Sequence, residues 1–309
     1  MKKTGFAFTL FSVCFAAAAV TLAFLSYVGR TARLRVAQQY ISPDYVRYIS
    51  QGYAFDTVSN KKNILITVTD SESLPVRIHL FTIDEDKNTL DILDLPPDSF
   101  IIADGFSGTL QEAFSTSVYR EIISMILCMR IDGTASFDAK TLGDGAQMLG
   151  VTIGKGIEVT SELGERIALD GLAYSAEDIE SVKLYRTLLA EILTNLSERG
   201  SLDSFTVLMN LIVNRVSTDM TIEDLIAVAN SANGVKPKKI NIRIAKGSPA
   251  KFGDSRIWSL DADGVAEMLN NHFRVKDIEF PADSLSIPKV TAGEFPYSSL
   301  PEKVSDITK

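Results

Sequence analysis

The sequence has few of the side chains from which metal and nucleophile sites are usually built. Its 309 residues include two cysteines, Cys14 and Cys128, and two histidines, His79 and His272. So few cysteines exclude a disulfide framework and a thiolate zinc site, and two histidines argue against a His-rich metal site or a catalytic triad. A glycine-rich phosphate loop is also missing. Residues 143–145 (Gly-Asp-Gly) lack the strand–turn–helix context and the following Lys-Ser/Thr.

Basic residues are the minority once the N-terminus is set aside. The chain has 31 Lys and Arg against 39 Asp and Glu, a net charge of -8. Residues 1–35 contain five basic residues and no acidic one, so residues 36–309 carry 26 basic against 39 acidic side chains, a net charge of -13. A body this acidic lacks the electrostatic surface of a nucleic-acid binder. The 46% apolar and 23% charged content is that of a globular chain.

One long uncharged run occupies the N-terminus. Gly5–Val28 contains no charged residue, with Lys2 and Lys3 before it and three arginines soon after it. As a helix it would reach roughly 36 Å, enough to cross a bilayer core of about 30 Å. We interpret it as an uncleaved transmembrane anchor after a short cytoplasmic N-terminus (1–4). A cleaved signal peptide is the alternative, because Ala16–Ala19 supply small residues. Charge counting alone favours a cytoplasmic body.

The remainder predicts one α/β domain at 61–275, after a polar juxtamembrane segment at 29–60. Short apolar, β-branched runs predict strands at 63–69, 77–83, 90–95 and 239–245, and a strand-like stretch ends at Phe137. The strands at 77–83 and 90–95 are predicted to form a hairpin around the polar residues 84–88. Helical periodicity predicts six helices: 109–128, 139–149, 178–199, 201–216, 221–232 and 263–273. This order favours a central mixed sheet with helices on both faces. Residues 276–309 contain four prolines and no period, and predict a flexible tail.

Two carboxylates follow predicted strands and are the candidate site residues. Asp70 ends the first strand, and Asp98 lies just beyond the third. Ligands gather at the carboxyl ends of strands in α/β sheets, and two acids there could hold a hard cation such as Mg²⁺. The alternative from spacing alone is that both residues only cap turns. His79 in mid-strand and Trp258 are interpreted as packed residues.

Five segments also occur in an order typical of one family. Asn63–Asp70 matches a strand reading Asn-Ile-Leu-Leu-Leu-Gly-x-Asp, Leu80–Asp84 matches a strand ending Leu-x-Ser/Thr-Ile-Asp, and Leu95–Ser99 matches Ile-Pro-Arg-Asp-Thr/Ser. Leu169–Tyr174 matches Leu-Asn-Gly-x-x-Ala-Leu-Ala-Tyr. Ser255–Phe273 fits an element in which a small-residue loop precedes an aromatic strand, an Asp and a helix ending in Phe. From about residue 63 to 273 the chain therefore resembles the LytR–CpsA–Psr family of bacterial envelope proteins.

The resemblance implies a function and shows where this chain departs from it. Family enzymes move glycopolymers from a polyprenyl-pyrophosphate carrier to peptidoglycan with Mg²⁺, and they hold the pyrophosphate with arginines. If Leu80–Asp84 fixes the register, the positions of the second metal-binding Asp and of four arginines carry other residues here: Val76, Leu74, Pro97, Ser181 and Leu184. A register shifted by one or two positions through 72–77 would instead put Glu72 or Arg77 into the site. Arg77 and Arg186 lie nearby but do not match. Since Arg–phosphate bonds hold such groups, the chemistry is expected to be lost while the fold is kept.

These observations lead to a main interpretation and an alternative. The first is a membrane-anchored, extracytoplasmic envelope domain that binds a polyprenyl-linked polymer, a lipid or a protein partner without catalysis, with Asp70 and Asp98 as remnants and no cofactor. The alternative is an active phosphotransferase, with Mg²⁺ bound by Asp70. The orientation rests on the family, which places this domain outside the cell membrane, against the charge count. A cytoplasmic-facing membrane regulator is a third reading.

The family also places the carrier tail in an apolar cleft between sheet and helices. Apolar side chains on the predicted helices could line such a cleft here, although they could equally form only the core: Met125, Ile126, Leu188, Leu189, Ile192, Leu208, Met209 and Ile212.

Overall fold

A computed structural model describes most of the predicted domain. The described residues are 61–103, 106–170, 179–198, 215–232, 235–252, 254–274, 281–285, 287–288 and 293–308. The predicted anchor, the juxtamembrane segment and residues 201–214 of the fourth predicted helix lie outside these ranges. Within them, no helix combines the length and the apolar character needed to span a bilayer. Residues 55–309 form one compact unit that contains the whole sheet and both hydrophobic clusters described below.

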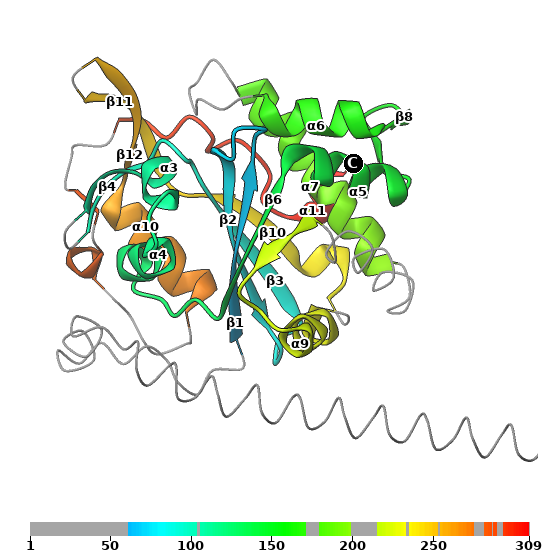
Figure 1. The fold of residues 1–309 in the computed structure, drawn as a ribbon, viewed down its shortest axis with the longest axis horizontal. Helices are drawn as coiled ribbons and strands as arrows, with labels where there is room; N and C mark the ends of the chain where they lie inside the picture. The colour runs from blue at the N-terminus through cyan, green and yellow to red at the C-terminus, as the bar shows by residue number, and fades with distance from the viewer. Residues whose placement is uncertain are drawn as a thin grey trace, which may run out of the picture. The chain divides into compact units, whose positions relative to one another are not determined.

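A six-stranded mixed sheet forms the centre of this unit (Figure 1). Its order is β10-β3-β2-β1-β6-β9, and its strands are β1 (Lys61–Thr69), β2 (Pro75–Asp84), β3 (Thr89–Leu95), β6 (Gly133–Asp138), β9 (Ser217–Thr218) and β10 (Ile240–Ile244). The pairs β1–β2, β2–β3 and β6–β9 are antiparallel, whereas β1–β6 and β3–β10 are parallel. The predicted strands and the hairpin between β2 and β3 are confirmed.

One face of the sheet is covered by α3 (Leu110–Phe114), α4 (Tyr119–Leu127) and α10 (Ala262–Met268), which ends in a π-helical turn at Leu269–Phe273. Leu65, Leu80 and Leu93 of the sheet lie in its hydrophobic cluster, together with Trp258, which is fully buried as predicted. Two small hairpins flank this layer: β4 (Phe100–Ala103) with β5 (Phe106–Thr109), and β11 (Gly247–Phe252) with β12 (Ser255–Leu260).

The other face is covered mainly by α5 (Ala139–Met148), α6 (Ser161–Leu169) and α7 (Ile179–Glu198), as Figure 1 shows. Val68, Ile83 and Ile92 alternate with the residues that point to the first face and join this second cluster. The remaining elements of the described chain include α9 (Ile222–Ala232), α11 (Val304–Ile307) and the short β7–β8 hairpin (Thr152–Ile153 and Ile157–Glu158). Sheet and helices on both faces therefore agree with the predicted fold class.

One sequence interpretation near the first face is wrong. The single helix predicted at 109–128 is broken between Phe114 and Tyr119, where Ser-Thr-Ser follows and the Thr116 hydroxyl donates to the carbonyl of Ala113. Hydroxyl side chains compete for backbone groups in this way, and so they favour helix ends.

The prediction of a flexible tail at 276–309 is also wrong for the residues that the structure describes there. Leu285, Ile287, Tyr297 and Val304 are buried in the two clusters, and the Tyr297 ring stacks on Trp258 at 5.8 Å between centroids. The packing uses apolar residues at irregular intervals, which no periodic pattern reveals. The folded domain consequently extends beyond residue 275.

Gly143, which sequence reasoning excluded from a phosphate loop, has a packing role. It lies inside α5, where a Cβ atom would overlap the carbonyl oxygen of Ser161 and crowd the backbone of Glu165 in α6. The side-chain-free position therefore lets α5 and α6 approach closely.

Gly143→Ala is expected to destabilise the protein by about 1–3 kcal/mol, because the added methyl forces α5 and α6 apart. At an unobstructed helix position, the same change stabilises by roughly 0.5–1 kcal/mol. The measurement is urea unfolding followed by circular dichroism, with Met148→Ala on the exposed side of α5 as the control. A gain in stability for Gly143→Ala would contradict the close approach of the two helices.

Candidate functional site

Asp70 and Asp98 follow the carboxyl ends of β1 and β3, and these ends lie at the same end of the sheet. These two strands run parallel to each other with β2 between them, so their ends are separated by roughly 10 Å, two inter-strand spacings. The structure therefore brings the two predicted site residues to the same end of the sheet, but the strands that they follow are not neighbours. Among the described residues, no group of three His, Cys, Asp or Glu side chains is arranged to hold a metal ion.

Asp70 caps the turn that links β1 to β2. Its Oδ1 accepts hydrogen bonds from the backbone N–H groups of Glu72 and Leu74, both at 2.9 Å. The Leu74 carbonyl in turn accepts from the N–H of Asp70 at 2.9 Å. This is the turn-capping role that spacing alone offered as the alternative to a metal ligand.

Asp98 lies in a different environment. Its backbone carbonyl accepts from the N–H of Trp258 at 3.0 Å, but its Oδ1 is buried and has no hydrogen-bond partner. Burial raises the pKa of this carboxyl to about 7, because the charged form loses its hydration. The side-chain oxygen of the neighbouring Ser99 is likewise buried and without a partner. Asp98 is therefore not a satisfied turn cap, and its burial favours the protonated form.

Asp98→Asn is expected to stabilise the protein at pH 8 by on the order of 1–3 kcal/mol and to have little effect at pH 4. The folded-state pKa is raised, so the cost of the buried charge builds up as the pH rises from about 4 to about 7. Thermal or urea unfolding across this pH range gives the difference. Asp254→Asn, an exposed carboxylate, is the control for the loss of one negative charge. A pH-independent difference between Asp98→Asn and the native protein would contradict the raised pKa.

A buried polar cluster lies between the sheet and α7. His79 Nε2 and the Tyr185 hydroxyl are 2.7 Å apart, and His79 Nδ1 is 3.5 Å from Asp94 Oδ1. The order acid–imidazole–hydroxyl is that of a catalytic triad, but all three side chains are almost fully buried. Burial also lowers the pKa of His79. The cluster thus packs the interior, as predicted for His79, and no substrate reaches it.

The two arginines that the sequence places near the site are buried in the same layer. Arg77 donates to the Asp170 carbonyl, and its guanidinium lies over the Tyr185 ring at 4.3 Å from the centroid. Arg186 donates to the carbonyls of Ile242 at 2.7 Å and Pro301 at 2.6 Å. Both guanidinium groups therefore bind backbone carbonyls within the fold.

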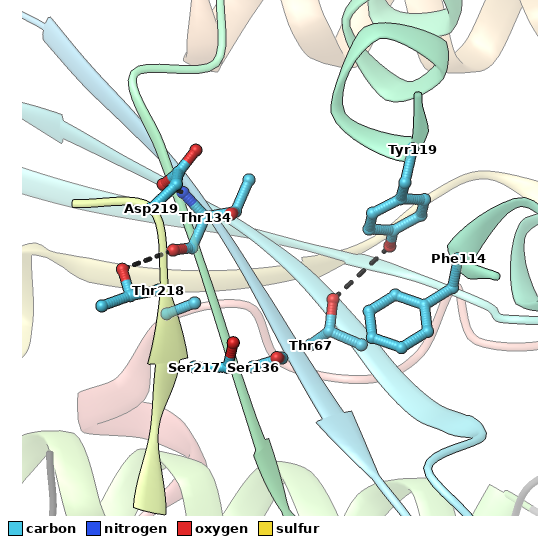
Figure 2. Close-up of a pocket in the computed structure, with 9 residues that line it drawn as sticks. Thr67, Phe114, Tyr119, Thr134, Ser136, Ser217, Thr218 and Asp219 are labelled. Carbon is cyan, nitrogen blue, oxygen red and sulfur yellow. Dashed lines mark hydrogen bonds between the residues drawn. The ribbon is translucent and has the colours of Figure 1, made fainter. Parts of the chain in front are cut away.

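A cavity of about 280 Å³ opens on the opposite face, between α3, α4 and the β1–β6–β9 part of the sheet (Figure 2). Its walls combine two aromatic rings with several hydroxyl groups: Thr67, Phe114, Tyr119, Thr134, Ala135, Ser136, Ser217, Thr218 and Asp219. The Tyr119 hydroxyl and Thr67 Oγ1 are 3.5 Å apart across its floor. Sequence reasoning missed this cavity, because its residues come from five elements and none has an unusual spacing.

At the rim of the cavity, Asp219 follows β9 and contacts β6 and α4. Its carboxylate accepts from the Thr134 N–H and from Arg120, both at 2.7 Å. The helix residues expected to line an apolar cleft are not part of this cavity. Ile126, Leu188, Leu189 and Ile192 are buried core residues, Met125 packs against the core, and Leu208, Met209 and Ile212 lie outside the described residues.

Comparison with known proteins identifies the fold. No family model and no curated protein sequence matches the chain, but solved structures do. TagT, solved bound to LIIa-WTA, aligns over 68% of this chain and 88% of its own, with a TM-score of 0.56 at 14% identity. Bacillus subtilis TagV aligns over 70% and 98%, with a TM-score of 0.56 at 16% identity. An Enterococcus faecalis transcriptional regulator aligns over 69% and 86%, with a TM-score of 0.55 at 16% identity.

TagT and TagV are LytR–CpsA–Psr proteins. This chain has the LytR–CpsA–Psr fold. The positions at which the family motifs carry charge can now be located in it. Val76, which the resemblance aligns with the second Asp, is 2% exposed inside the sheet, and Pro97, which it aligns with an Arg, is buried. Leu74 and Leu184, which it also aligns with arginines, are each 39% exposed.

Proposed function

We propose that this protein is a membrane-anchored envelope protein whose LytR–CpsA–Psr domain binds a polyprenyl-linked polymer, a lipid or a protein partner without transferring a polymer. Residues 5–28 form the anchor, and the domain lies outside the cell membrane. The fold supports an envelope role, because TagT was solved bound to LIIa-WTA, a wall teichoic acid precursor. The assignment of a binding role rather than a transferase role rests on the arginines.

Arg77 and Arg186 carry this part of the proposal. A pyrophosphate is held and its transition state stabilised by cationic side chains, above all by arginine. Both arginines near the site are buried and already bind backbone carbonyls of Asp170, Ile242 and Pro301. Turning Arg186 toward a phosphate would leave the buried Ile242 carbonyl without this donor, at a cost of about 1–3 kcal/mol. Turning Arg77 would remove its contacts with the Tyr185 ring and the Asp170 carbonyl.

The residues present do not fit a magnesium ion. Mg²⁺ requires near-octahedral oxygen ligands, and carboxylates with several waters bind it weakly unless substrate phosphates complete the shell. Asp70 Oδ1 already accepts two backbone N–H groups, and the burial of Asp98 favours its protonated form. Val76 replaces the second acidic ligand of the family. We propose accordingly that the domain works without a resident cofactor.

The cavity beside Tyr119 is a candidate place for part of a ligand. Its volume of about 280 Å³ lies just below the range for small-molecule sites, roughly 300–1,000 Å³. It therefore accommodates a segment of a polymer or lipid and not a whole polyprenyl chain. The hydroxyl groups on its walls would bind the polar portion of such a ligand.

The decisive experiment is a transfer assay on the purified full-length protein with a lipid-linked glycopolymer, Mg²⁺ and peptidoglycan. We expect no transfer above background, and no difference between the native protein and Asp70→Ala. An active family enzyme in the same preparation is the positive control. Transfer that disappears in Asp70→Ala would instead establish the phosphotransferase alternative.

Binding is measured separately, so that an inactive protein is distinguished from an unfolded one. Titration of the protein with a polyprenyl pyrophosphate, with Mg²⁺ and with EDTA, is expected to give the same affinity in both conditions. Affinity that depends on Mg²⁺ would contradict the absence of a resident cofactor.

The orientation is tested by a C-terminal fusion to alkaline phosphatase, which is active only outside the cytoplasm. We expect an active fusion in cells and an inactive one when residues 5–28 are deleted. An inactive fusion of the full chain would favour the cytoplasmic-facing regulator.

A further inference from the structure

The β11–β12 hairpin carries an exposed aromatic surface. It projects away from the central sheet beside β4 (Figure 1). At its tip, Phe252 is 62% exposed and stacks on Phe100 of β4, with ring centroids 4.7 Å apart. Ile102, two residues along β4, is 53% exposed. Large apolar side chains are therefore gathered in solvent at a protruding end of the domain.

Two cations lie opposite each other in the same hairpin. Lys251 of β11 pairs with Arg256 of β12 in the strand register, and both are exposed. Neither forms an ion pair or a side-chain hydrogen bond with any residue that the structure describes. Like charges directly opposite each other destabilise a strand pair. The arrangement therefore costs the isolated domain stability, which an anion bound at the hairpin would recover.

We propose that the β11–β12 tip docks onto the surface of an anionic lipid bilayer. Aromatic side chains favour the boundary between headgroups and acyl chains, and lysine and arginine bind the phosphates of anionic lipids. Strand neighbours point to opposite faces, so Phe252 and the two cations leave the tip on different sides. A tip-first approach brings both sides to the interface, since long basic side chains reach headgroups from either face.

The charge of the rest of the chain sets the orientation of this docking. Residues 36–309 have a net charge of -13, so an anionic surface repels most of the body and attracts this tip. A soluble polyanion would account for Lys251 and Arg256, but it has no use for the exposed Phe252–Phe100 stack. The proposal goes beyond the function proposed above and does not depend on whether the domain transfers a polymer.

Vesicle sedimentation of the compact unit, residues 55–309, tests the proposal. Binding is expected to phosphatidylglycerol vesicles and not to phosphatidylcholine vesicles, and to weaken with added salt. Lys251→Gln/Arg256→Gln is expected to lower the partition coefficient about 30-fold, from two cations at about 1 kcal/mol each. Phe252→Ser is expected to lower it about tenfold. Lys236→Gln/Lys238→Gln and Ile222→Ser, exposed elsewhere on the domain, are the matched controls and leave binding unchanged.

Thermal melting of the same variants separates lost binding from lost folding. The Lys251→Gln/Arg256→Gln variant is expected to melt at the same temperature as the native unit or higher, since the opposed charges are removed. In the full chain reconstituted into nanodiscs, Phe252→Trp fluorescence is expected to be quenched by brominated phosphatidylglycerol, and Ile157→Trp fluorescence is not.

Three results would overturn the proposal. The first is equal sedimentation with neutral and anionic vesicles, and the second is unchanged sedimentation of the hairpin variants. The third is binding of soluble polyphosphate that is lost in Lys251→Gln/Arg256→Gln but unaffected by Phe252→Ser, which would make the hairpin a polyanion site.

Discussion

The second face of the domain depends on two arginines that are bound by backbone carbonyls in the interior. Arg186 connects α7 to the edge strand β10 through Ile242 and to the C-terminal segment through Pro301. Arg77 connects β2 to the end of α6 through Asp170 and lies against Tyr185 of α7. Burying a guanidinium group is costly without hydrogen-bond partners, so these contacts favour the observed position of α7 on the sheet.

This use of arginine links the fold to the proposed loss of chemistry. A guanidinium group can bind carbonyls inside a domain or phosphates at its surface, but not both in one conformation. Near the site, the family motifs place arginines where this chain has Leu74 and Leu184, which are partly exposed apolar residues. The two arginines nearby in the sequence, Arg77 and Arg186, are buried and bind backbone carbonyls.

The sequence was sufficient to predict the parts of the fold that follow from local patterns. The β-branched runs gave β1 to β3, and the stripe of apolar residues gave α7. Thr221 and Asp224 form a reciprocal cap at the start of α9, where the helix was predicted to begin. The break before Tyr119 has a local cause in Ser-Thr-Ser, but the helical period across 109–128 concealed it. The packing of Tyr297 and Val304 depends on contacts with distant segments, and so no local pattern predicts it.

The site was predictable only as a location. The predicted strand order placed Asp70 and Asp98 at the same end of the sheet. It could not show that Asp70 caps a turn, or that Asp98 has a buried carboxyl oxygen without a hydrogen-bond partner. That difference arises from the packing of β12 against the segment after β3, since the Asp98 carbonyl accepts from the Trp258 N–H. The cavity beside Tyr119 was missed for the same reason: its walls meet only in the folded chain.

The two edges of the central sheet are protected from strand addition in different ways. At one edge, β9 is only two residues long, which leaves little for another chain to pair with. At the other edge, the segment at 301–303 lies along β10. The Ile242 N–H donates to the Glu302 carbonyl at 2.8 Å, and Arg243 Nε pairs with the Glu302 carboxylate at 3.0 Å. Residues 301–303 therefore protect β10 from self-association. Without them, this hydrophobic edge strand would be open to strand addition by a second molecule.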